Sequence, residues 1–199
     1  MMYHVLRVLS YLPVRVLWLG RVVGLQKIDK KDSFIIAANH TSYLDFILLF
    51  ILLPRKISFL AAEKFFRSSF WRPIMQWTGQ IKVDRQSEDK TEVYKNVDRI
   101  LKEGRVLGIF PEGTRSRTGK INKAYNGVAK FAYKYKIPVV PVGIKNAYSD
   151  WSPQMSKPKI KKCDIIIGEP IYINNTDFDV ATRNIMKNIA NLVEDTYEY

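Results

Sequence analysis

Short apolar runs alternate with longer amphipathic segments along this chain, and little linker separates them. The apolar runs are typical of buried strands, and the amphipathic segments are typical of helices. Because parallel strands must be joined by crossover connections, this alternation predicts a mostly parallel, mixed sheet flanked by helices. A length of 199 residues favours one domain of this α/β class.

The expected strands lie at 33–38, 57–61, 80–83, 105–110, 139–142 and 164–167. The expected helices lie at 44–53, 63–77, 88–102, 127–136 and 178–196, with Pro54 and Gly104 as stop signals. Residues 146–162, which contain two prolines and four lysines, are expected to form a loop.

The N-terminal segment, residues 1–21, has the pattern of an amphipathic helix. One narrow stripe carries polar and aromatic side chains, and the wide opposite face is apolar; the stripe holds His4, Arg7, Tyr11, Arg15 and Trp18, and the apolar face holds Val5, Leu6, Leu9, Leu12, Val16 and Leu19. A helix in a membrane interface has this pattern, and so does a helix packed on the protein's own core. We carry the segment forward as a membrane-association segment, with both interpretations open.

Other features limit what the N-terminal segment can be. Arg7 and Arg15 interrupt the apolar run, so it is neither a secretory signal nor the roughly 20 apolar residues that span a bilayer. Pro13 lacks a backbone donor and should kink or split the helix. A cluster of aromatic and basic residues could likewise contact a bilayer or pack in the core of the protein. It comprises Phe65, Phe66, Phe70, Trp71 and Trp77 with Lys64, Arg67 and Arg72.

The net charge of +13 requires a polyanionic partner, which could be nucleic acid, a phospholipid surface or a phosphorylated substrate. No helix-turn-helix, zinc-finger or RNA-binding signature is present, so nucleic acid is not expected. Two distant histidines and the single Cys163 form no metal-ligand cluster, and no metal is expected. Cys163 lies beside an apolar strand and is expected to be a small core residue.

His40 directly follows an expected strand and begins the sequence His-Thr-Ser-Tyr-Leu-Asp, which ends at Asp45. If Thr41 or Ser42 caps the following helix, Asp45 lies in its first turn, where the helix dipole favours a carboxylate. A carboxylate there could orient the imidazole as a general base. Local hydrogen bonding of a structural histidine would explain the same two residues.

Three further segments accompany this motif. Phe110 to Ser116 (FPEGTRS) follows an expected strand, and Arg115 has the planar fork that suits phosphate oxygens. The other two are Gly79 to Arg85 and Val140 to Ile144. In order and spacing, the four segments resemble the four blocks of the glycerolipid acyltransferases, and the closest resemblance is to bacterial 1-acyl-sn-glycerol-3-phosphate acyltransferases.

The resemblance implies an acyltransferase domain over residues 22–199, with the fold of that family. It implies that His40 is the catalytic base and that Asp45 orients it. It also implies an acceptor-binding set made of Arg85, Glu112, Gly113, Thr114 and Arg115, with Lys64 ahead of the second block. The stretch before Gly127, KAYN, departs from the aromatic and basic pattern of the family, so the resemblance assigns no acceptor contact there, and a substitute contact from Lys123 stays open.

The implied reaction transfers a fatty acyl group from a thioester to the 2-hydroxyl of lysophosphatidic acid, which gives phosphatidic acid. The implied donor is acyl-CoA or acyl-acyl carrier protein, no further cofactor is expected, and the implied location is the cytoplasmic face of a membrane, bound peripherally or monotopically. Related enzymes acylate glycerol 3-phosphate or other lysolipids, so the acceptor stays open. A basic nucleic-acid-binding or lipid-binding module without catalysis is the alternative of another class.

Overall fold

A computed structural model describes residues 2–28, 31–84, 87 and 89–199. Across these residues the chain forms a seven-stranded sheet in the order β1-β7-β6-β2-β5-β3-β4. The strands are β1 (Leu19–Val23), β2 (Ile35–Ala38), β3 (Ile57–Ala62), β4 (Ile81–Val83), β5 (Val106–Ile109), β6 (Val139–Lys145) and β7 (Cys163–Ile167). Neighbouring strands pair in parallel, except that β6 and β7 are antiparallel.

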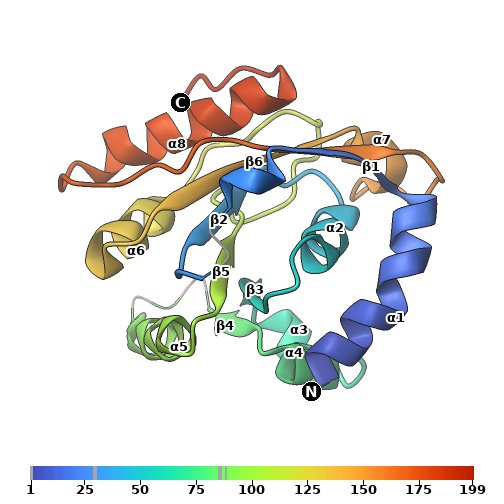
Figure 1. Cartoon of the computed structure of the whole chain (residues 1–199), viewed down its shortest axis with the longest axis horizontal. Coiled ribbons are helices and arrows are strands. Elements are labelled where there is room, and N and C mark those ends of the chain that lie inside the picture. The colour runs from blue at the N-terminus through green and yellow to red at the C-terminus, as the bar shows by residue number, and fades with distance from the viewer. Residues whose placement is uncertain (1, 29–30, 85–86, 88) are drawn as a thin grey trace.

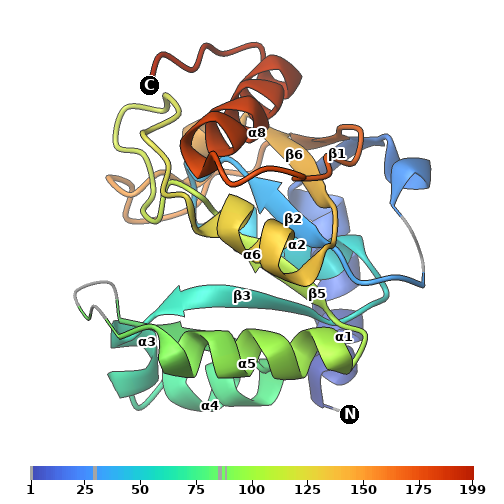
Figure 2. The ribbon, with the colours of Figure 1, turned by 90° about the vertical axis from the view of Figure 1, so that its left-hand side faces the viewer.

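Helices cover both faces of this sheet (Figure 1). They are α1 (Met2–Leu17), α2 (Leu44–Leu52), α3 (Lys64–Arg67), α4 (Trp71–Thr78), α5 (Thr91–Lys102), α6 (Gly127–Tyr135), α7 (Ala147–Trp151) and α8 (Phe178–Val193), with a short 3-10 helix at Leu25–Lys27. Figure 2 looks onto one face, where α5, α6 and α8 lie in front of the strands. The expected α/β fold with a mostly parallel mixed sheet is therefore confirmed.

The alternation of side chains along β2 divides the core into two layers. Ile36 and Ala38 pack in the cluster that contains the buried residues of α1 and α2. Ile35 and Ala37 pack in the cluster that contains those of α5, α6 and α8. All four residues are buried, as expected for a central strand covered on both sides.

Two local expectations were wrong, and one strand was missed. The predicted helix over 63–77 is two helices, because the chain is extended at Ser68, whose hydroxyl accepts a hydrogen bond from the Trp71 amide (3.3 Å). The predicted loop over 146–162 begins with the helix α7, which is too short to show helical periodicity. Strand β1 was not predicted; it includes residues on both sides of the expected segment boundary at 21/22.

The helix α1 runs unbroken through Pro13, so the predicted split does not occur. Pro13 is exposed, so its ring lies at the surface of the protein. The side of α1 that faces the protein is anchored by Tyr3, whose hydroxyl accepts a hydrogen bond from the Ile57 amide (3.0 Å), and by Arg7, which donates to the Ile51 carbonyl (3.2 Å).

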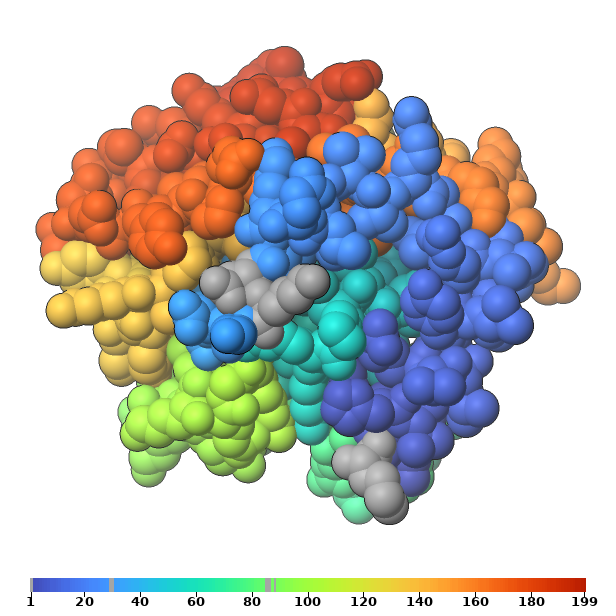
Figure 3. Space-filling view, viewed as in Figure 1, coloured from blue at the N-terminus to red at the C-terminus, as the bar shows by residue number. Residues whose placement is uncertain are grey.

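The outward side of α1 is apolar and uncovered. Its exposed apolar side chains include Val5, Val8, Leu9, Leu12 and Val16. In Figure 3 the N-terminal segment, in dark blue, lies at the lower right of the molecule. Among the described residues, no helix is both long enough and apolar enough to cross a bilayer.

Candidate active site

The predicted site residues follow the carboxyl ends of adjacent parallel strands. His40 comes two residues after β2, and Glu112 and Arg115 follow β5, which pairs directly with β2. Lys64 begins α3 after β3, the next strand outward. Because strands lie about 4.8 Å apart, Lys64 starts from a position roughly 10 Å from the His40 strand. The carboxyl edge of the sheet is where open α/β folds bind ligands.

His40 and the buried Asp45 form a hydrogen-bonded pair. Nδ1 of His40 lies 2.9 Å from Oδ2 of Asp45, which has no solvent exposure. The same Oδ2 accepts the backbone N–H groups of Thr41 (2.7 Å) and Ser42 (2.8 Å). These amides belong to the turn that leads into α2, so the turn fixes the position of the carboxylate beside the imidazole. The Ser42 hydroxyl caps this turn by accepting the Leu44 amide (3.0 Å).

The His40 ring is oriented from two sides. Phe110 stacks on the imidazole, with centroids 4.0 Å apart and an angle of 14° between the planes. In the neutral ring, Nδ1–H donates to Asp45, which leaves the lone pair on Nε2 free to accept a proton. The His40 side chain is 18% exposed, so part of the imidazole is open to solvent.

Glu112 is buried, and both of its carboxylate oxygens accept backbone N–H groups. Oε1 accepts the amide of His40 (2.7 Å), and Oε2 accepts the amide of Asn122 (2.8 Å). Burial raises the pKa of Glu112 to about 7, although the two backbone donors act in the opposite direction. Both oxygens of Glu112 are hydrogen-bonded, and the residue is only 2% exposed. This geometry supports a role in holding the backbone at His40 rather than direct contact with an acceptor hydroxyl.

Arg115 lies close to His40 through the backbone, since the amide of Ser116 donates to the His40 carbonyl (2.8 Å). Its guanidinium lies over the ring of Tyr43, with 3.7 Å between Cζ and the ring centroid. Thr114 is exposed in the same turn. Gly113 has a φ of 69°, which favours glycine, and a Cβ there would lie 3.0 Å from the Tyr125 ring.

The structure does not bring two residues of the predicted acceptor set, Lys64 and Arg85, to the His40–Asp45 pair. Lys64 is exposed at the start of α3, and its ammonium lies 5.5 Å from the Phe65 ring centroid. Arg85 lies outside the described residues. The strand that precedes it in the sequence, β4, pairs in parallel with β3 and so points to the same edge of the sheet.

Asn39 supports the site and was not singled out from the sequence. Its side-chain amide donates to the Ile144 carbonyl (3.0 Å) and its side-chain oxygen accepts the Ile144 amide (2.8 Å). The side chain thereby continues the pairing of β2 with β6 for one more position, immediately before His40. A polar amide directly after the apolar run Ile35–Ala38 was the available signal.

Cys163 is buried, as predicted, and its thiol donates to Asp150 Oδ2 (3.1 Å). Burial raises the pKa of this thiol, so it is poorly suited to act as a nucleophile. Among the residues that the structure describes, no group of three or more His, Cys, Asp or Glu side chains could hold a metal ion.

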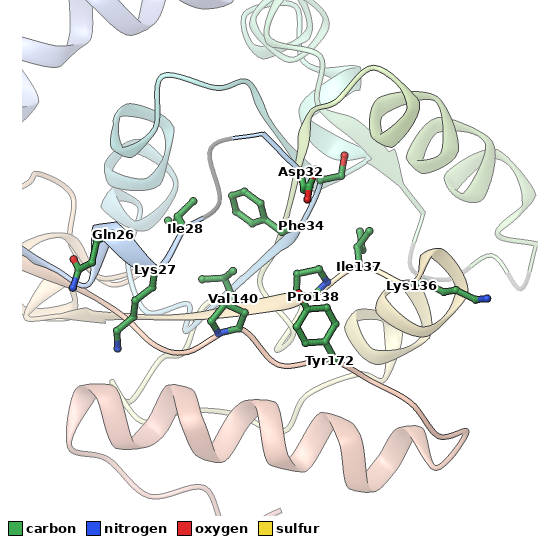
Figure 4. A pocket seen from close by; sticks show the side chains of 12 residues that line it. Gln26, Lys27, Ile28, Asp32, Phe34, Lys136, Ile137, Pro138, Val140 and Tyr172 are labelled. Atoms are coloured by element: carbon green, nitrogen blue, oxygen red, sulfur yellow. The ribbon is translucent and has the colours of Figure 1, made fainter.

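A cavity of about 590 Å³ lies at the opposite end of the sheet (Figure 4). Its lining includes Phe34 and Pro138, which precede β2 and β6, together with Lys27 and Tyr172. His40 lies beyond the other end of β2, so this cavity is separate from the candidate active site.

Comparison with known proteins matches residues 20–145 to the acyltransferase family. The chain belongs to this family. The match includes all four motif segments completely. It also includes His40, Asp45, Glu112 and Arg115.

Relatives of this acyltransferase include the 1-acyl-sn-glycerol-3-phosphate acyltransferases of Bacillus subtilis and Saccharomyces cerevisiae. The first is 29% identical over 153 residues, which cover 76% of this chain and 73% of the relative. The second is 31% identical over 156 residues, which cover 76% of this chain and only 49% of the relative. A crystal structure of the 1-acyl-sn-glycerophosphate acyltransferase from Thermotoga maritima matches with a TM-score of 0.77 and 22% identity, over 94% of this chain and 77% of the other. That likeness confirms the expected fold.

Proposed function

We propose that this acyltransferase transfers a fatty acyl group from an acyl thioester to the 2-hydroxyl of lysophosphatidic acid and so makes phosphatidic acid. The observation that carries the proposal is the His40 Nδ1 to Asp45 Oδ2 contact of 2.9 Å, with Arg115 held beside it. The relatives named above, which carry this activity in their names, support the choice of acceptor.

In the proposed reaction, Nε2 of His40 takes the proton from the acceptor hydroxyl as its oxygen attacks the thioester carbonyl. The Asp45 carboxylate stabilises the imidazolium that forms. When the carbon–sulfur bond breaks, the imidazolium returns the proton to the leaving thiolate. The new ester and the free thiol leave the enzyme unchanged, so no acyl-enzyme is required.

The acceptor phosphate is proposed to bind the guanidinium of Arg115, which lies over the Tyr43 ring. Gly113 and Thr114 lie in the same turn and would line this side of the acceptor. Lys64, which follows β3, and Arg85, whose position lies outside the described residues, would contribute further positive charge. Glu112 would hold the His40 backbone in place for this reaction.

An acyl-transfer assay tests the proposal. The purified chain is incubated with acyl-CoA or acyl-acyl carrier protein, each crossed with lysophosphatidic acid, glycerol 3-phosphate and lysophosphatidylcholine. We expect phosphatidic acid from lysophosphatidic acid with at least one donor. Turnover of glycerol 3-phosphate alone would reassign the acceptor, and no transfer in any combination would contradict an enzymatic role.

We also propose that the enzyme works at a membrane surface, on the cytoplasmic face where its thioester donors occur. The uncovered apolar side of α1 supports this, as do Phe70, Trp71 and Trp77, which are exposed on or beside α4. Helices α1 and α4 contact each other, so the two groups can meet one surface. The exposed lysines at 157, 159 and 161 lie beyond the end of α1, where they could meet anionic headgroups.

A further inference from the structure

We infer that Tyr43 is a positioning residue, which sets the orientation of the Arg115 guanidinium toward the phosphate of the acceptor. The inference deepens the proposed function and rests on it. Tyr43 lies between the catalytic residues His40 and Asp45 in the sequence, yet it takes no part in their hydrogen bonds.

The contact between the two side chains is close. Cζ of Arg115 lies 3.7 Å from the centroid of the Tyr43 ring. An arginine in this position is attracted to the face of the ring and keeps its N–H groups for other partners, because these point outward from the edge of the guanidinium. Within the described ranges, the Arg115 guanidinium has no hydrogen bond and no ion pair. Its donors are thus free for a ligand.

Tyr43 is itself held in place by α7. Its backbone amide donates to the Trp151 carbonyl (3.1 Å), and the hydroxyl of Ser42 donates to the same carbonyl (2.9 Å). The rings of Tyr43 and Trp151 are also in contact, with centroids 5.2 Å apart. The aromatic ring is therefore a fixed support, although it is 39% exposed.

The other end of the contact is fixed to the catalytic base. The amide of Ser116 donates to the His40 carbonyl, so the backbone beside Arg115 cannot move away from His40 without breaking this bond. A flexible arginine anchored only at its backbone would sample many rotamers, and each rotamer lost on binding lowers affinity. The Tyr43 ring restricts these rotamers in advance, at a place from which the donors can reach a phosphate near His40.

The test compares Tyr43→Leu with Tyr43→Phe in steady-state kinetics with lysophosphatidic acid. We expect Tyr43→Leu to raise KM for this acceptor by about 3- to 20-fold with kcat nearly unchanged, because an arginine–ring contact contributes affinity of this order. Tyr43→Phe keeps the ring and should resemble the wild type. Tyr172→Leu removes an exposed tyrosine at the distant cavity and serves as the matched control.

A double-mutant cycle with Arg115→Gln separates positioning from a general structural effect. If Tyr43 acts through Arg115, adding Tyr43→Leu to Arg115→Gln should raise KM no further. An equal rise in both backgrounds would overturn the inference, as would an unchanged KM in Tyr43→Leu. If Tyr43→Leu unfolds, Tyr43→Met, which also lacks the ring, takes its place.

Binding of a soluble short-chain lysophosphatidic acid, measured by calorimetry, distinguishes the two levels of the proposal. If the wild-type chain neither binds nor acylates this lipid, both the proposed function and the inference are wrong. Wild-type chain that binds and acylates it, with Tyr43→Leu binding equally tightly, would overturn the inference alone.

Discussion

The carboxylate of Asp45 holds the imidazole of His40 and the turn beneath it with a single oxygen. Oδ2 lies 2.9 Å from His40 Nδ1 and accepts the backbone amides of Thr41 and Ser42. Because the carboxylate is fully buried, these contacts are not weakened by bulk water. The first turn of α2 and the end of β2 are thereby joined at the proposed base.

Replacing Asp45 with asparagine should lower kcat by about 10²- to 10⁴-fold, because an amide cannot stabilise the imidazolium. It should also lower the free energy of unfolding by about 1–3 kcal/mol, since buried donors lose a charged acceptor. Steady-state kinetics and urea denaturation measure the two effects. The matched control is Asp150→Asn, which alters another fully buried carboxylate that contacts Cys163 instead; an equal loss of kcat in that variant would count against a special role for Asp45.

Stability should depend on pH through Glu112. Its pKa rises from 4.5 to about 7 on folding, so the folded chain binds this proton more tightly than the unfolded chain. Its contribution to stability is complete below pH 4.5 and is lost as pH rises to about 7, by about 3 kcal/mol at most. Glu112→Gln removes this titration, so the stability difference between wild type and variant should change over that window.

Urea denaturation at intervals between pH 4.5 and 8 measures this difference. Glu169→Gln is the matched control, because Glu169 is exposed and paired with Lys27 at the surface. If the difference in the free energy of unfolding between wild type and Glu112→Gln stays constant across this pH range, the proposed titration is wrong.

Arg115→Gln should raise KM for lysophosphatidic acid by about 10- to 100-fold, since charge-assisted hydrogen bonds to phosphate contribute this much affinity. Turnover at saturating acceptor should change far less. Arg117→Gln, an exposed arginine two residues further along, provides the control for lost positive charge. Equal KM values in the two variants would place the phosphate elsewhere.

Membrane association should depend on the uncovered side of α1. The double substitution Leu9→Gln and Leu12→Gln should reduce co-sedimentation with anionic vesicles by at least about tenfold, because each leucine gains roughly 1.5–3 kcal/mol when it leaves water. Both side chains are more than two-thirds exposed, so the fold should tolerate the change. Val180→Gln alters an exposed residue on α8, on the opposite face of the sheet. Undiminished sedimentation of the double variant would move the membrane contact away from α1.

Structural features that are set by residues close together in the sequence could be predicted. Features that are set by contacts between distant residues could not. The strand runs and the His40 to Asp45 spacing are local patterns, and the structure confirms the strands and joins the pair. Strand β1 lacks such a pattern: its Arg21 amide pairs with the side chain of Asp164, far along the chain. No local signal reveals an edge strand that is fixed in this way.

The buried state of Glu112 was hidden for the same reason. In the sequence it stands between Pro111 and Gly113, which is typical of an exposed turn. It is buried because the backbone at Asn122 folds over it and donates to its carboxylate. The contact between Arg115 and Tyr43 also joins two loops that the sequence shows separately.

The turnover of His40→Ala with an acyl thioester and lysophosphatidic acid tests the central claim most directly. With thermal unfolding and lysophosphatidic acid binding measured in parallel, we expect a folded variant that binds the acceptor and has a kcat at least about 10³-fold below wild type. A folded His40→Ala chain that turns over within tenfold of the wild-type rate would show that another group removes the hydroxyl proton.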